Sequence, residues 1–60
     1  MAALLAWKPR AWIPNVAGTW VEVLMRDGST CVVQVVRGAS GLHELDGIAI
    51  TDVVGWRGVS

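Results

Sequence analysis

The feature that most constrains the fold is an Asp-Gly pair set between two runs rich in valine. The segment from Trp20 to Val36, WVEVLMRDGSTCVVQVV, places Asp27-Gly28 between these runs. An Asp-Gly pair flanked by such residues is a strong signal for a two-stranded antiparallel hairpin. We therefore expect a central hairpin over residues 19–37.

Two registers of this hairpin are compatible with the sequence. A two-residue loop would pair Arg26 with Ser29, whereas a three-residue loop with Gly28 in the left-handed region would pair Met25 with Ser29. We favour the second register because it gathers apolar side chains on one face, and a buried face fixes register. That face would hold Val21, Val23, Met25, Cys31, Val33 and Val35. The opposite face would hold Trp20, Glu22, Leu24, Thr30, Val32, Gln34 and Val36.

Shorter strands are expected after the hairpin. Residues 37–41 form a turn, Leu42–Leu45 a short strand, and Asp46-Gly47 a second turn. Ile48–Thr51 is interpreted as either another strand or a loop. Residues 42–57 would then contain the closing strands of the domain.

The last strand is expected over Asp52–Arg57. Simple alternation would put Val53 and Gly55 on one face, with Val54 and Trp56 on the other. A glycine inside a strand indicates a bulge or the close approach of another backbone.

The first 18 residues are expected to form an extended N-terminal arm. Pro9 and Pro14 prevent a helix over this segment, so a helical turn or two is possible only over Ala2–Trp7. This opening has no basic region and its apolar run stops at Lys8, so it is not a signal peptide. The sequence has no transmembrane stretch either, and it predicts a cytoplasmic protein.

The whole chain is expected to be one all-β domain. Its predicted architecture is an antiparallel sheet of four to five short strands, closed into a small SH3-like barrel and carrying the arm. The alternative is an open antiparallel sheet that dimerises through one face. Sixty residues form only a small core, and the single cysteine, Cys31, allows no disulfide within the chain. We expect Cys31 to be a buried, unreactive apolar side chain.

Composition favours binding over catalysis. Hydrophobic residues make up 53% of the chain, so a domain this small is expected to leave apolar surface for a partner. The net charge is zero, with basic residues near the start and acidic residues in 41–52. We predict a homo-oligomer or a protein partner, and neither a membrane nor a small-molecule substrate.

The hairpin and closing strand resemble small proteins of unknown function encoded by bacteriophages and prophages. The matching pieces are Val21-Glu22-Val23, Arg26-Asp27-Gly28, His43 and Asp52-Val53-Val54-Gly55-Trp56-Arg57, together with the Trp-rich arm. Leu42 stands where the group would have a tryptophan. The resemblance covers about two thirds of the chain and implies a viral or prophage origin, hence the host cytoplasm. It implies no activity.

No catalytic residue, cofactor site or metal site is predicted. His43 and Glu44 are adjacent on a strand, so they point to opposite faces and do not converge. His43 is expected to bond a neighbour such as Asp52, and Arg57 to contact Asp52 or Trp56.

The candidate interaction residues are the four tryptophans and the cations near them. The main prediction is a protein-protein interaction or self-assembly module, because tryptophan supplies large apolar contacts. The alternative is a nucleic-acid-binding β barrel, since the arm interleaves aromatic and basic residues. The residues concerned are Trp7, Lys8, Arg10, Trp12, Trp20, Trp56 and Arg57.

Overall fold

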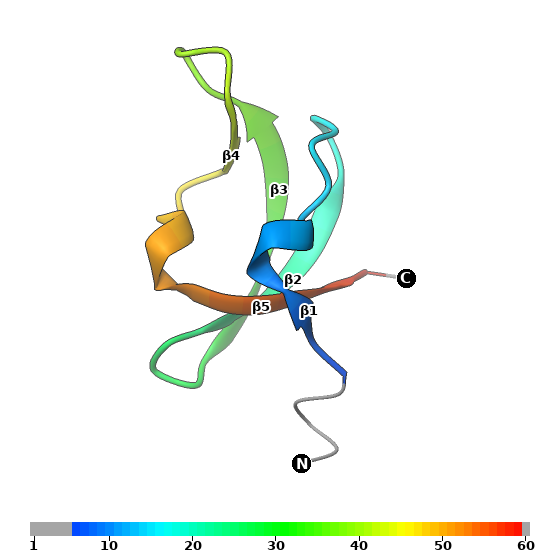
Figure 1. Cartoon of the computed structure of the whole chain (residues 1–60), viewed down its shortest axis with the longest axis vertical. Helices are drawn as coiled ribbons and strands as arrows, with labels where there is room; N and C mark the ends of the chain where they lie inside the picture. The colour runs from blue at the N-terminus through cyan, green and yellow to red at the C-terminus, as the bar shows by residue number, and fades with distance from the viewer. Residues whose placement is uncertain (1–5, 60) are drawn as a thin grey trace.

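The computed structural model describes residues 6–59 as a strongly curled, five-stranded antiparallel sheet (Figure 1). The strands are β1 Lys8–Pro9, β2 Trp20–Met25, β3 Thr30–Arg37, β4 His43–Leu45 and β5 Val53–Gly58, in the order β1-β5-β2-β3-β4. Two short 3-10 turns, η1 Arg10–Trp12 and η2 Ile50–Asp52, complete the elements. The described residues contain no α-helix, so the all-β prediction is confirmed. The sheet is a half-barrel whose two edges are β1 and β4.

The central hairpin adopts the three-residue loop. Met25 N–H donates to Ser29 O at 2.8 Å, and Gly28 N–H donates to Met25 O at 3.0 Å. Gly28 has φ +89°, the left-handed conformation that glycine adopts without steric cost. Val23 lies opposite Cys31, so the predicted register is confirmed.

The concave side of the curled sheet holds the core. Val21 and Val23 are completely buried there, and Cys31 is only half-buried, at the margin of the core. The predicted apolar face of the hairpin is therefore the inner face of the half-barrel. The buried core residues are Val21, Val23, Val33, Val35, Leu45, Val53 and Trp56.

A bulge in β5 corrects the predicted faces of the closing strand. Met25 pairs with Val53 and Leu24 pairs with Gly55, which leaves Val54 as an extra residue. One extra residue reverses the alternation beyond it. Trp56 therefore shares the inner face with Val53, and the prediction that they face opposite sides is wrong.

The N-terminal arm joins the sheet as its edge strand. Lys8 pairs with Trp56 and Pro9 pairs with Gly55, along the outer edge of β5. A Cβ added to Gly55 would lie 3.0 Å from Lys8 O, which confirms the predicted close approach of another backbone. The arm is not extended throughout, because η1 turns the chain after Pro9. Residues 1–5, and the helical alternative placed on them, lie outside the described residues.

The segment between β4 and β5 forms turns instead of a further strand. Ile48 makes one isolated bridge with Leu45, and the chain then enters η2. Asp52 ends η2, so the closing strand begins one residue later than predicted. Arg26 holds this segment to the hairpin tip, because its Nε donates to Thr51 O at 2.8 Å. Nothing in residues 6–59 is a helix of the length and apolarity that spanning a membrane requires.

Candidate interaction surfaces

Trp56 is a structural residue that ties the arm to the core. Its side chain is buried, and its Nε1–H donates to Pro9 O at 3.1 Å. Lys8 Nζ lies 4.8 Å from the centre of the Trp56 ring, a cation–π distance. Trp56 is therefore closed to a partner, whereas Lys8 remains exposed above it.

Trp7 packs on the convex side of the sheet, together with an ion pair. Arg57 Nε donates to Glu22 Oε1 at 2.7 Å, across the β5–β2 pairing. The guanidinium of Arg57 lies 4.3 Å from the centre of the Trp7 ring. Gly55 makes room for Trp7, whose Cβ would be 3.2 Å from an added Cβ. The expected contact of Arg57 with Asp52 or Trp56 is therefore wrong.

The rest of the convex side remains exposed. Trp20 and Val32 are each 53% exposed, and Leu24 and Val36 beside them are half-buried. We call this surface the outer face. It consists of Trp20, Glu22, Leu24, Thr30, Val32, Gln34, Val36 and Arg57, with Trp7 at one side.

The aromatic and basic residues of the arm do not share one surface. Trp7 lies on the outer face, whereas Lys8 lies over the buried Trp56. Arg10 Nη1 donates to Ile50 O at 3.3 Å and to Val53 O at 3.4 Å, so this cation joins the arm to η2 and β5. Trp12, at 68% exposed, is the most exposed of the four tryptophans. Nucleic-acid binding through this arm stays a prediction. Within residues 6–59, the aromatic and basic side chains of the arm do not form one continuous surface on which bases could stack.

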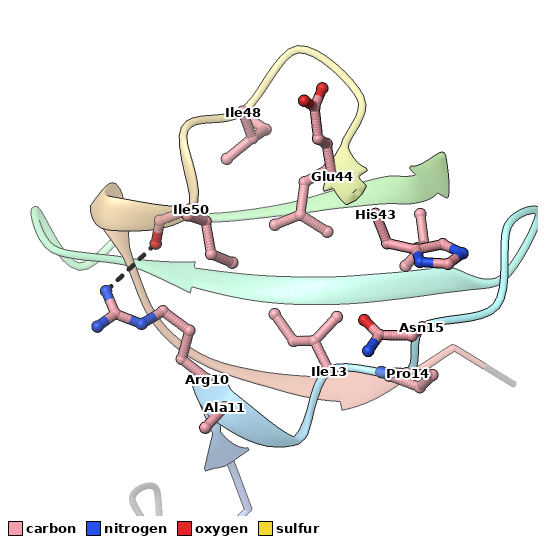
Figure 2. Close-up of a pocket in the computed structure, with 11 residues that line it drawn as sticks. Arg10, Ala11, Ile13, Pro14, Asn15, His43, Glu44, Ile48 and Ile50 are labelled. Atoms are coloured by element: carbon pink, nitrogen blue, oxygen red, sulfur yellow. Dashed lines mark hydrogen bonds between the residues drawn. The ribbon is translucent and has the colours of Figure 1, made fainter. Parts of the chain in front are cut away.

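A cleft opens where the half-barrel fails to close. It has a volume of about 260 Å³ and lies between the segment that follows β1 and the segment around β4 (Figure 2). Ile13 and Ile50 point into it from opposite walls. We call it the seam cleft. Its lining residues are Arg10, Ala11, Ile13, Pro14, Asn15, Val35, His43, Glu44, Leu45, Ile48 and Ile50.

The sequence did not predict the seam cleft, because its walls come from segments about 30 residues apart. One available signal was the opposite charge of these segments, basic near the start and acidic in 41–52. The two segments do lie side by side. Across the cleft, however, Arg10 bonds backbone carbonyl groups of η2 and β5.

Among the titratable residues, Asp27 stabilises the hairpin turn. Ser29 donates to Asp27 Oδ1 through its hydroxyl at 2.6 Å and through its N–H at 2.9 Å, and these bonds lower the pKa of the Asp27 carboxyl. Asp27 is therefore bonded within its own turn. His43 lines the seam cleft and is not bonded to Asp52 in the part of the chain that the structure describes. Over residues 6–59, no three His, Cys, Asp or Glu side chains are grouped to hold a metal ion.

Comparison with known proteins adds no relative to this picture. No protein-family model, curated protein or solved structure matches the chain. The resemblance to small phage proteins stays a prediction.

Proposed function

We propose that this protein is a non-enzymatic binding module that associates with a second copy of itself through the outer face. The observation that carries the proposal is the exposure of Trp20 and Val32 on the regular strands β2 and β3. Large apolar side chains grouped on one face of a sheet are typical of an interface, and tryptophan is among the residues most enriched at binding hot spots.

Two tryptophans from outside the hairpin, Trp56 and Trp7, are the side chains expected to cover the outer face within one chain. Trp56 of the closing strand turns inward to the core. Trp7 of the arm covers the side next to β5, over Gly55 and Arg57. Within residues 6–59 neither side chain covers Trp20, which remains 53% exposed, and a second molecule would bury it.

The charges on the outer face favour a second copy as that molecule. Among the described residues of β2, β3 and β5, the charged side chains on this face are Glu22 and Arg57, and they pair with each other. A two-fold contact brings the same patch together on both subunits, so a patch with unpaired charge would repel itself. Glu44 of β4, opposite Val36, adds a carboxylate on this side at the β4 edge of the sheet. The centre of the face is apolar, and two packed sheets lie about 10 Å apart. Dimerisation would also stabilise the small core, which has seven buried side chains within residues 6–59.

Sedimentation equilibrium of the 60-residue chain tests the proposal. We expect the wild type to dimerise at concentrations below about 1 mM, which corresponds to only about 4 kcal/mol of association free energy. Val32→Glu should give a monomer, because each copy would place an unpaired carboxylate in the interface.

The matched control is Val16→Glu, at a loop residue that is 62% exposed and lies off the outer face. It should dimerise like the wild type. A wild type that remains monomeric at about 1 mM would contradict the proposal. Equal weakening by both substitutions would contradict it as well, because it would indicate an effect of net charge alone.

A further inference from the structure

The seam cleft is a second surface, on the side of the sheet opposite the outer face. We propose that it binds an extended segment of a partner protein, which pairs with the free edge of β4 and places an aliphatic side chain in the cleft. The segment would act as the missing strand of the half-barrel.

The free edge follows from the pairing of β3 with β4. Leu42 O accepts from Gly38 N–H at 2.7 Å, and Asp46 N–H donates to Gln34 O at 3.0 Å. Backbone groups in an antiparallel strand alternate between its two sides. The N–H and C=O of His43 therefore point away from β3, toward the open seam. A free strand edge of this kind is a template for another strand.

The chain itself covers the next position along this edge. Ile48 N–H donates to Leu45 O at 3.3 Å and forms an isolated bridge with it. The chain then leaves β4 and turns into η2. Among residues 6–59, His43 is thus the point on β4 where an incoming strand finds both a backbone donor and a backbone acceptor that no described residue bonds.

The opposite wall offers a polar group at the same end of the cleft. Asn15 and His43 both line this end (Figure 2). The Asn15 side-chain amide has donors and an acceptor, as a peptide group has. Pro14 beside it has no N–H, so this wall cannot itself close onto β4 as a regular strand.

The size and lining of the cleft fit a side chain better than a cofactor. Its volume of about 260 Å³ falls below the range of about 300–1,000 Å³ for small-molecule sites. Ile13, Leu45, Ile48 and Ile50 give it aliphatic walls, and its described lining contains no Phe, Tyr or Trp. A branched aliphatic side chain therefore matches this space.

Arg10 sets the charge that the partner should carry. It stands at the Ile50 end of the cleft, where one of its nitrogen atoms, Nη1, bonds the carbonyl groups of Ile50 and Val53. Its positive charge is balanced there by peptide oxygens and by no carboxylate within the described residues. A partner segment should therefore carry an acidic residue, or its terminal carboxylate, at this end.

Selection from a library of random eight-residue peptides tests the inference. The full chain is the target, with Ile50→Glu as the blocked variant, because Ile50 is 46% exposed and lies outside the core. Val32→Glu is the matched control, with the same charge change on the outer face. We expect peptides with alternating aliphatic residues and an acid at one end. They should bind the wild type and Val32→Glu equally, and Ile50→Glu at least tenfold more weakly.

A selected peptide is then titrated into the isotope-labelled chain, and amide shifts are followed by NMR. Shifts at His43, Leu45 and Ile13, lost when the central peptide nitrogen atoms are methylated, support strand pairing. Binding that survives methylation would overturn it, since only a side-chain pocket would then be in use. Enrichment of no peptide would overturn it too. Cleft shifts that change with protein concentration alone would make a second copy the occupant, against the proposal.

Discussion

The two faces of the central hairpin carry similar residues, but one face is buried and the other is exposed. Val33 is 8% exposed and its neighbour Val32 is 53% exposed, although both are valines in the middle of β3. Val33 lies on the inner face, toward which β4 and β5 curl and where Trp56 is inserted. Burial in β3 therefore depends on the direction in which the sheet curls, and not on residue type. Burying one valine contributes about 1.5–3 kcal/mol, so the inner face supplies most of the stability.

The largest expected effect comes from exchanging one tryptophan on each face for alanine. Trp56→Ala should destabilise the fold by about 3–5 kcal/mol, since it leaves a cavity in the core. A domain of this length has only about 3–9 kcal/mol in total, so the variant should be largely unfolded. Trp20→Ala should cost less than about 0.5 kcal/mol in the monomer. Urea denaturation at low protein concentration measures both changes. Equal losses of unfolding free energy would contradict the different burial of the two faces.

Adjacent valines of β3 give a sharper version of the same contrast. Val33→Thr places a hydroxyl of nearly the same shape in the core, and should cost about 1–3 kcal/mol. Val32→Thr faces solvent in the monomer and should cost almost nothing. The change in urea midpoint compares them directly. A larger effect at Val32 would mean that the outer face is already buried in the species measured.

Substitution of Gly55 tests the contact between the N-terminal arm and β5. Gly55→Ala would bring a Cβ to 3.0 Å from Lys8 O and 3.2 Å from Trp7 Cβ. We expect a loss of about 1 kcal/mol, at the low end for overpacking because the arm can shift. Gly58→Ala is the control in the same strand, since an added Cβ there meets no atom within 4 Å. Similar losses for both would show that strand propensity, and not the arm, is being measured.

The smallest expected effect concerns Asp27 in the hairpin turn. This turn fixes the register of β2 and β3, and the register decides which side chains face the core. Ser29 lowers the pKa of Asp27 in the folded chain, so folding favours the ionised carboxylate. This contribution is present above the pKa of the unfolded state and is lost as the pH falls through the lower folded value. Asp27→Asn should therefore flatten the pH dependence of stability below pH about 4. Acid titration followed by circular dichroism measures this pH dependence. An unchanged curve would mean that ionisation of Asp27 does not contribute to stability.

Local patterns predicted the hairpin well. The register followed from requiring one apolar face, and Gly28 in the left-handed region matched the loop that this register needs. The closing strand was predicted less well, because its faces depend on a bulge at Val54. A bulge is set by how β5 must bend around the core, which two-residue alternation does not encode. Gly55 was the one local signal for it.

The outer face could be predicted in part from the sequence, whereas the seam cleft could not. The apolar residues of the outer face were visible in the sequence, since Trp20, Leu24 and Val32 alternate with the core valines. Their exposure was not, because it depends on where Trp7 and Trp56 come to lie. The seam cleft depends wholly on the tertiary structure, which brings Ile13 opposite Ile50.

The sequence by itself determined an all-β chain, its central hairpin, the register of that hairpin and a wholly apolar face. These depend on contacts close along the chain, where turn chemistry and side-chain alternation decide the outcome. Only the tertiary structure decided which way the sheet curls, that Trp56 enters the core, and that the arm and β4 leave a cleft between them. Those outcomes depend on packing between segments far apart in sequence, and packing is chosen by the shape of the whole core.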